Sequence, residues 1–513
     1  MLKRIASLIL AFGICALCFS GCGSKKLSNE EISAVTKSAI KKTQQLDNAK
    51  ITVSNSIGYN YNNRSTTVKT TSEYAGTNLN DENGFEMSED TTVTTPASSS
   101  EYENYYKNGY YYTNRYNGNF KVKKSAKELG LSGYCPLIIF NYEDMKSVGV
   151  GDEKTSSGEI GTVITFTPKN SVLKKYIAKA LSEENSGFDN ESINVSGSTG
   201  TYTVDKNGYL SHEKLTVNAT VTIDGDTVAT SLVAEISYTD IGKKVDPYDP
   251  EDSDYTEVDD LAPVAGIDNA LSKTLSSDSL NMDMSSSVDI TMDKQSQGYK
   301  RTYNRKYSLS NEQVYQQSTT DYTTANGKKS TSVSGMYYTD GTYYNRSDMY
   351  SHKIYSTMSF SEFYSGIFVS ASTTPADIYS PGMMKNIKQQ KNGDDTIYSF
   401  DVNTESEAGK NFFSALFGPY SEFGGDFGTA EINVKSFSGK TYVNKNGEYY
   451  KTEMSIKADI KFKEGSLSVS AAQTVKVSDI GKKISIKYPN FKEYTNMDKN
   501  DLLSASSSVS TNG

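Results

Sequence analysis

The feature that most constrains how this chain folds is an internal repeat, because a repeat means that one architecture occurs twice. The run Asp240 to Lys244, Asp-Ile-Gly-Lys-Lys, recurs 239 residues later as Asp479 to Lys483. Nearer the front, residues 47–61 pair with residues 278–292 at an offset of 231. The growing offset indicates short loop insertions within a shared framework. The 513 residues are therefore predicted to form two tandem domains, where length alone would suggest about three.

The repeat also predicts where each domain begins and ends. The two copies are expected at residues 28–256 and 265–495, and each is long enough to bury a sizeable core. The Ser-rich residues 496–513 have few apolar side chains to bury, so we expect a disordered tail there.

An acidic stretch lies between the copies. Residues 246–260 carry eight acids and no base, which by itself is typical of a disordered linker. However, Pro250, Tyr255 and Thr256 have counterparts that close the second copy. The acidic linker is therefore predicted at residues 257–264 only.

The N-terminus predicts the compartment. Residues 1–21 have a charged start, a short apolar core and small residues before the cut, as in a secretory signal peptide. Ser20-Gly21-Cys22 resembles the bacterial lipobox, whose Cys thiol takes a diacylglyceryl group and becomes the new N-terminus. The resemblance implies a lipidated tether at residues 22–27 and a protein anchored by lipid on the outer face of the cytoplasmic membrane. The alternative is an ordinary signal peptide with a chance Cys.

Cysteine usage agrees with export but offers no reactive site. Cys15 and Cys18 leave with the signal peptide and Cys22 is acylated, so Cys135 is the one thiol expected in the mature chain. A single thiol forms no internal disulfide. We expect Cys135 to be a small buried apolar residue rather than a nucleophile.

Period-two alternation dominates both copies and predicts strands with one apolar and one polar face. The same pattern recurs late in each copy, from Leu215 to Ile223 and from Met454 to Phe462. Asn-Gly and Asp-Gly pairs punctuate these runs and supply the positive φ angles of tight hairpins. The apolar face of the first strand in each copy is the candidate ligand-binding surface: Ile51, Val53, Ile57 and Tyr59, then Met282, Met284, Val288, Ile290 and Met292.

Helices are few and are placed alike in the two copies. Ser28 and Glu31 form a capping box before an apolar stripe. A second helix is expected around Val172 to Leu181, and its counterpart is predicted to open with Thr404 and Glu407. The fold class is therefore α+β, with two tandem domains. Each is a large curved antiparallel sheet of up to ten strands, a half-barrel, covered by one to three helices.

These features together resemble a known family. The lipobox, the opening helix, the Met- and Tyr-bearing strands, the Lys107 to Tyr112 hairpin and the closing Asp-Ile-Gly-Lys-Lys strand are similar to the LolA and LppX class of β half-barrel lipoproteins, above all its Gram-positive members. The resemblance implies an apolar concavity that accepts acyl chains or the lipids of lipoproteins. The tandem arrangement departs from the usual single domain of that class.

Catalytic chemistry finds little support in the sequence. There are two His residues, His212 and His352, and neither is repeated at the corresponding offset. No metalloprotease, redox, nucleophile-elbow or phosphate-loop motif is present in the sequence. We therefore predict a non-enzymatic protein with no cofactor and no metal site. The net charge of −9 also argues against a nucleic-acid partner.

Two functions from different classes remain. The first is a lipid-anchored binding protein that holds a hydrophobic ligand in the concave face of its half-barrels. The second is a non-catalytic envelope module whose outward rows of Tyr, Asn and Thr meet wall glycan or another surface protein. The 38 Tyr residues are consistent with either function, because Tyr can stack on sugar rings and also favours half-buried strand positions.

Overall fold

The computed structural model describes residues 27–61, 64–81, 84–95, 99–131, 140–150, 161–182, 192–223, 226–292, 295–348, 351–368, 379–417, 431–462 and 465–499. The predicted signal peptide, Cys22, Cys135 and most of the predicted tail lie outside these residues. The chain divides into two compact units: unit 1 holds Met1–Arg115 and Lys123–Asp252, and unit 2 holds Tyr116–Val122 and Ser253–Gly513.

The described residues form two twelve-stranded sheets. The strands of the first sheet are β1 (Ala49–Tyr61), β2 (Arg64–Thr77), β3 (Glu86–Thr94), β4 (Ser99–Lys107), β5 (Tyr110–Thr113), β6 (Phe120–Lys123), β7 (Met145–Val150), β8 (Thr162–Pro168), β9 (Ile193–Val204), β10 (Leu210–Ile223), β11 (Asp226–Thr239) and β12 (Thr256–Val258). They lie in the order β12-β6-β5-β4-β3-β2-β1-β11-β10-β9-β8-β7.

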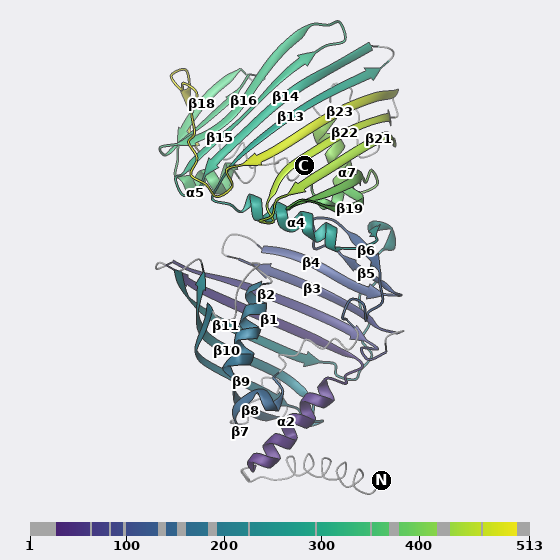
Figure 1. The fold of residues 1–513 in the computed structure, drawn as a ribbon, viewed down its shortest axis with the longest axis vertical. Coiled ribbons are helices and arrows are strands. Elements are labelled where there is room, and N and C mark those ends of the chain that lie inside the picture. Colours follow the sequence, from purple (N-terminus) through teal and green to yellow (C-terminus); the bar gives the residue numbers. More distant parts are fainter. Residues whose placement is uncertain are drawn as a thin grey trace. The chain divides into compact units, whose positions relative to one another are not determined.

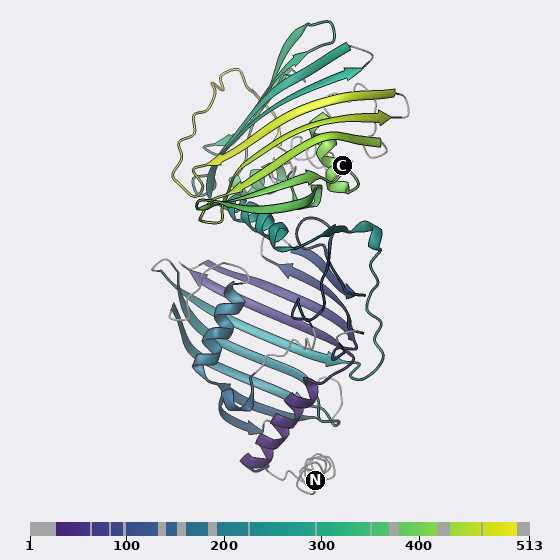
Figure 2. The same cartoon turned by 45° about the vertical axis from the view of Figure 1, so that its right-hand side comes forward.

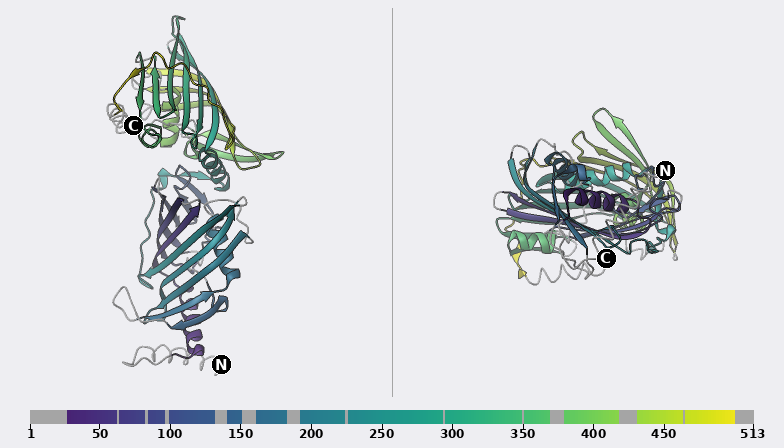
Figure 3. Two further views of the ribbon diagram at one scale, coloured as in Figure 1. Left: turned by 90° about the vertical axis from the view of Figure 1, so that its left-hand side faces the viewer. Right: turned by 90° about the horizontal axis from the view of Figure 1, so that it is seen from below.

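The second sheet has the same strand order. Its strands are β13 (Ser279–Met292), β14 (Gln295–Ser308), β15 (Gln313–Thr323), β16 (Lys329–Thr339), β17 (Thr342–Ser347), β18 (His352–Thr357), β19 (Met384–Asn392), β20 (Asp395–Val402), β21 (Glu431–Val443), β22 (Tyr449–Phe462), β23 (Gly465–Ser478) and β24 (Thr495–Asn496). They lie in the order β19-β20-β21-β22-β23-β13-β14-β15-β16-β17-β18-β24. The fold class predicted from the sequence is confirmed: both sheets are curved and antiparallel (Figures 1 and 3), apart from the short parallel pairs β12–β6 and β18–β24.

The sheets contain more strands than the ten expected. The additional strands are short edge strands such as β6, β12 and β24, which span four, three and two residues. Runs of this length show no readable alternation, because a period of two needs several residues to be seen. The segment expected as a linker, residues 257–264, contains most of β12 and the start of a helix.

Hairpin geometry follows from the predicted turn residues. Asn108-Gly109 and Asp340-Gly341 each take two successive positive φ angles, 52° and 81° in the first pair and 50° and 71° in the second. Two residues with positive φ make the type I′ turn, whose twist matches the flanking strands. The turns therefore fix the register of β4 against β5 and of β16 against β17.

The repeated Asp-Ile-Gly motif has a structural role. Asp240 and Gly242 take positive φ angles of 51° and 69°, and Asp479 and Gly481 take 56° and 65°. Each glycine N–H then donates back to the chain just before or at the start of the first strand of its own sheet, to the carbonyl of Asn48 in one case and of Ser279 in the other. The motif thus ties the end of β11 to the start of β1 in the first sheet, and the end of β23 to the start of β13 in the second.

Helices cover one face of each sheet. They are α2 (Asn29–Thr43), α3 (Asn170–Ser182), α4 (Ala262–Leu275), α5 (Phe360–Phe363) and α7 (Glu407–Phe417), with 3₁₀ turns η1 (Tyr142–Asp144), η3 (Asp252–Asp254) and η5 (Pro381–Met383) and the π-turn η4 (Tyr364–Phe368). Figure 2 shows α2 and α3 lying across the same face of the first sheet.

The caps of these helices were predicted in part. The Ser28–Glu31 capping box of α2 is confirmed in both directions. The helix predicted to open with Thr404 and Glu407 begins at Glu407 as α7, and the cap is made by Ser406 in place of Thr404, since the Ser406 hydroxyl accepts from the Gly409 N–H at 3.0 Å. The hydroxyl of the residue directly before a helix can accept from the backbone N–H three residues later, which is the sequence spacing of an N-cap.

Candidate ligand-binding faces

Unit 1 places the predicted residues of β1 against its helices. Ile51 and Ile57 are each 4% exposed, and Val53 and Tyr59 are partly buried against the same core. The helical side of this core is made by Ile32, Val35, Ala39 and Ile40 of α2 and by Leu173 and Ile177 of α3.

Unit 2 buries its equivalent row more completely. Met282, Val288 and Ile290 are each 1% exposed, and Met284 is 8% exposed. Met292, predicted to share this face, is 36% exposed because it is the last residue of β13, outside the buried part of the sheet. The structure therefore brings four of the five side chains together under the helices and leaves the fifth outside.

Methionine distinguishes the core of unit 2 from that of unit 1. The main core of unit 1 contains Met145. The core of unit 2 contains Met282, Met284, Met336, Met358, Met383, Met384 and Met454. The same core contains aromatic rings of the covering elements, namely Phe363, Phe368, Phe412 and Phe413. Because Met side chains are unbranched and polarizable, this layer tolerates repacking better than a core of branched side chains.

A buried polar pair lies within the same layer. The Tyr379 hydroxyl donates to Gln473 Oε1 at 2.5 Å, and Gln473 Nε2 lies 2.7 Å from the sulfur of Met284. Burial raises the pKa of Tyr379 well above its ordinary value. Its hydroxyl therefore stays protonated and donates to Gln473, which in turn contacts Met284.

The outward tyrosines are covered by the chain itself. In unit 2 the closing segment, residues 484–494, places Phe491 face to face with Tyr344, with ring centroids 3.7 Å apart, and edge-on to Tyr494. Tyr337 beneath it is fully buried and donates to Gln317 Oε1 at 2.9 Å.

Unit 1 repeats this arrangement with its own closing segment, residues 245–252. Tyr248 packs on Tyr105 with centroids 5.2 Å apart, and the Tyr112 hydroxyl donates to Asp252 at 3.0 Å. Burial is the main reason that the pKa of Tyr112 is raised to about 12. Asp249 and Asp252 of this stretch thus contact the sheet through Lys107 and Tyr112, and the buried Tyr105, Tyr112 and Tyr337 are not open for sugar stacking.

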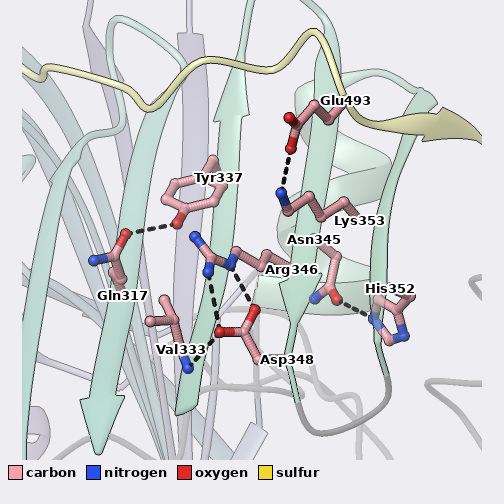
Figure 4. Close-up of polar contacts among 9 residues, drawn as sticks. All are labelled: Gln317, Val333, Tyr337, Asn345, Arg346, Asp348, His352, Lys353 and Glu493. Carbon is pink, nitrogen blue, oxygen red and sulfur yellow. Dashed lines mark hydrogen bonds and ion pairs between the residues drawn. The ribbon is translucent and has the colours of Figure 1, made fainter. Parts of the chain in front are cut away.

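A polar corner joins the last strands of unit 2 (Figure 4). Arg346 donates to both carboxylate oxygens of Asp348, at 2.8 and 3.0 Å, and Asp348 also accepts the Val333 N–H. The hydrogen-bonded guanidinium lowers the pKa of Asp348. His352 Nε2 lies 2.8 Å from Asn345 Oδ1. These contacts tie strands together and place no nucleophile beside a base.

The outer face of unit 2 carries two adjoining polar hollows of about 500 and 520 Å³. Both are lined by Ser285, Thr302, Glu453 and Thr474. Hydroxyl and carboxylate groups of this kind suit a polar ligand such as a glycan, and they contrast with the apolar inner face.

Two searches of the described residues complete the site. Within the ranges given above, no group of three or more His, Cys, Asp or Glu side chains is arranged to hold a metal ion. Among the helices of the described part, none has both the length and the hydropathy needed to span a bilayer.

Comparison with known proteins gives weak similarities. No family model matches the chain, and no curated protein matches it. Among solved structures, a LolA superfamily protein from Nitrosomonas europaea is 10% identical, with 43% of this chain and 94% of that chain covered and a TM-score of 0.14. A domain from Vibrio parahaemolyticus assigned to outer membrane lipoprotein sorting is also 10% identical, over 42% of this chain and 95% of that one, with a TM-score of 0.13.

A DUF1329 family protein from Desulfovibrio piger is similar to the same degree, at 10% identity, 44% and 97% coverage and a TM-score of 0.15. Scores this low carry no argument about function. The function has to be argued from the residues of this chain.

Proposed function

We propose that this protein is a lipid-anchored, extracytoplasmic binding protein that holds an acyl-chain ligand between the sheet and the helices of unit 2. The observation that carries the proposal is the methionine layer of unit 2, to which β13 contributes Met282 and Met284 and β22, on the other side of β23, contributes Met454. Flexible thioethers accommodate chains of differing length and saturation at small cost in packing energy. The core of unit 1, built mainly from branched side chains, lacks this property.

Anchoring supports the same function. The lipobox-like Ser20-Gly21-Cys22 implies a diacylglyceryl group on Cys22. A protein held at the membrane surface meets membrane lipids continuously, and the anchor keeps its domains on the extracytoplasmic side. The resemblance to half-barrel lipoproteins favours a Gram-positive cell.

Lipid extraction tests the proposal first. The chain from residue 23 to 513 keeps every described element and needs no detergent. We expect mass spectrometry of organic extracts from this protein to find about one acyl lipid per chain. Extracts that stay free of lipid, even after incubation with membrane lipids, would contradict the proposal.

Photo-crosslinking locates the ligand without requiring a mutation that threatens folding. A diazirine-bearing fatty acid should label peptides of β13, β22 and α7 in unit 2. Equivalent peptides of β1 and β10 in unit 1 serve as the matched control and should be labelled weakly. Labels confined to outer-face residues would place any lipid on the surface and reject the inner site.

The polar hollows favour a second function, an envelope module that binds wall glycan. Ser285, Thr302 and Glu453 offer hydroxyl and carboxylate partners there. If lipid extracts are clean, soluble muropeptides should broaden or shift the NMR signals of these residues. Unshifted signals would remove this alternative.

A further inference from the structure

A buried arginine stands in the apolar face of unit 2. Arg305 lies on β14, opposite Met282 of β13 on one side and Gln316 of β15 on the other. Its side chain is 4% exposed. The alternation of the strand directs Arg305 and Tyr307 toward the helices, so the guanidinium belongs to the inner layer and not to the polar outer face.

The guanidinium lacks a counter-charge. Its Nε and Nη1 atoms have no hydrogen-bond partner, and no ion pair within the described part of the chain involves it. Its nearest recorded contacts are the ring of Phe368, 4.3 Å from the guanidinium carbon, and that of Tyr307 at 5.6 Å. Burial raises the pKa of Tyr307 to about 12, so this phenol stays neutral and supplies no negative charge.

An uncompensated arginine at such a depth is unusual, because Arg stays protonated in proteins and buried charges are normally paired. Aromatic faces offset part of the desolvation cost and leave the hydrogen-bond donors unmet. The cross-strand neighbour Gln316 adds a second unmet group, since its Oε1 is also buried without a partner. The guanidinium of Arg305 and the amide oxygen of Gln316 are thus neighbouring polar groups that lack hydrogen-bond partners within an apolar layer.

Unit 1 fills the same position with side chains that hydrogen-bond to one another. Tyr74 stands opposite Ile51 as Arg305 stands opposite Met282, and Glu89 stands opposite Tyr74 as Gln316 stands opposite Arg305. The Tyr74 hydroxyl donates to one oxygen of Glu89 at 2.9 Å, and Asn104 donates to the other at 2.9 Å. The Tyr74 hydroxyl and both oxygens of Glu89 are therefore hydrogen-bonded within unit 1, and Asn104 Oδ1 is the buried atom of this cluster that has no partner.

Access to Arg305 passes through aromatic rings. The Phe368 ring that covers the guanidinium stacks in turn on Tyr364, with centroids 5.4 Å apart, and Tyr364 is 36% exposed. Arg305 is therefore two rings below the surface at this side of the unit. Displacement of the Phe368 and Tyr364 rings would let a head group reach the guanidinium from this side while its chain enters the methionine layer.

We propose that Arg305 binds the anionic head group of the acyl ligand in unit 2, through paired N–H donors to a carboxylate or phosphate oxygen, with Gln316 accepting a hydroxyl of the same head group. The planar guanidinium suits both oxyanions. Unit 2 therefore selects acyl chains that carry an oxyanion over neutral ones. The inference rests on the proposed function and adds the chemistry of the head group.

The test compares three amphiphiles of one chain length below their micelle concentrations: dodecanoate, dodecyl phosphate and the neutral 1-monododecanoylglycerol. Calorimetry on the delipidated chain 23–513 should show both anions binding at least about tenfold more tightly than the neutral compound. The ratio between dodecanoate and dodecyl phosphate then identifies which oxyanion the site prefers.

Two substitutions assign the effect to the residue. Arg305→Met should remove the preference for anions and leave binding of the neutral amphiphile within about twofold, as expected when a charge-assisted bond is lost. Arg301→Met is the matched control, because Arg301 lies four residues away on the same face of β14 and its Nε donates to the Thr320 hydroxyl at 3.3 Å. This control should keep the preference.

The outcomes separate this inference from the proposed function. Equal binding of all three amphiphiles by the unmodified protein, or a preference that survives Arg305→Met, overturns the head-group role and leaves acyl binding standing. Absence of binding by any amphiphile, together with clean lipid extracts, overturns both. If Arg305→Met fails to fold, Arg305→Lys decides: it keeps the charge but loses the planar fork, so it should weaken anion binding and retain part of the preference.

Discussion

Replacing Arg305 by Met should stabilise the empty protein, although the change removes contacts that the structure shows. An unpaired buried ion costs several kcal/mol in real proteins. The aromatic contacts with Phe368 and Tyr307 return about 1–2 kcal/mol each at desolvated sites. Met occupies a similar part of the layer and buries apolar surface. We expect unit 2 to gain about 2 kcal/mol, which raises its Tm by about 4–8 °C for a unit of this size.

Scanning calorimetry of the delipidated chain measures this gain. Unit 1 carries no change and provides an internal reference transition in the same scan. Arg301→Met should leave the Tm of unit 2 unchanged or lower it slightly, because the partner of Arg301 is then lost. Dodecyl phosphate should raise the Tm of the unmodified unit 2 and not that of the Arg305 variant.

A lower Tm for Arg305→Met would refute the reasoning. That result would mean that the aliphatic stem and the aromatic contacts of Arg305 outweigh the cost of its unpaired charge, and the residue would then be part of the packing. An unchanged Tm would show that the charge is compensated in solution, and the case for an anionic ligand would fall with it.

Three further predictions concern other parts of the chain. Phe491→Ala should destabilise unit 2 by about 2 kcal/mol, since it removes the ring stacked on Tyr344; urea unfolding measures this, and no change would mean that the closing segment is not held. Burial lowers the pKa of His212 from its ordinary 6.5, so the unfolded state binds more protons and the unfolding free energy of unit 1 should decrease as pH falls below that value. His212→Gln should flatten that pH dependence in urea titrations at pH 7.5 and 5, and an unaltered slope would assign it elsewhere. Cys22→Ala should prevent incorporation of labelled palmitate and leave the signal peptide attached, whereas a cleaved, labelled product would refute the lipobox assignment.

Much of the fold was predictable from the chain because strand alternation is a local property. The buried rows of β1 and β13, the Ser28–Glu31 cap and the Asn-Gly turns each depend on residues close in sequence. The strand number was underestimated because edge strands of two to four residues have no period to detect. Phe491 covers Tyr337 and Tyr344 although it lies about 150 residues away in the sequence. The sequence pattern alone therefore could not distinguish buried from exposed Tyr rows.

The sequence did contain an indication that Arg305 points inward, namely its position in the alternating pattern of β14. Tyr303, Arg305 and Tyr307 share a parity on β14, and that parity is the inward one because Met282 faces Arg305 across the strand pair. A charged residue in register with a buried methionine breaks the pattern at a single point. Such breaks are expected at functional positions, where local rules give way to ligand chemistry.

The difference between the two units then bears on which of them selects a ligand. They share a strand order, and at the position where Tyr74 and Glu89 satisfy each other in unit 1, Arg305 and Gln316 are both unmet in unit 2. A purely structural role would be served by side chains that hydrogen-bond to one another, as Tyr74 and Glu89 do in unit 1. Under the proposed function the charge is expected where an oxyanion is to be bound, beside the methionine layer proposed to accept its chain. On this reasoning we assign the choice of head group to unit 2.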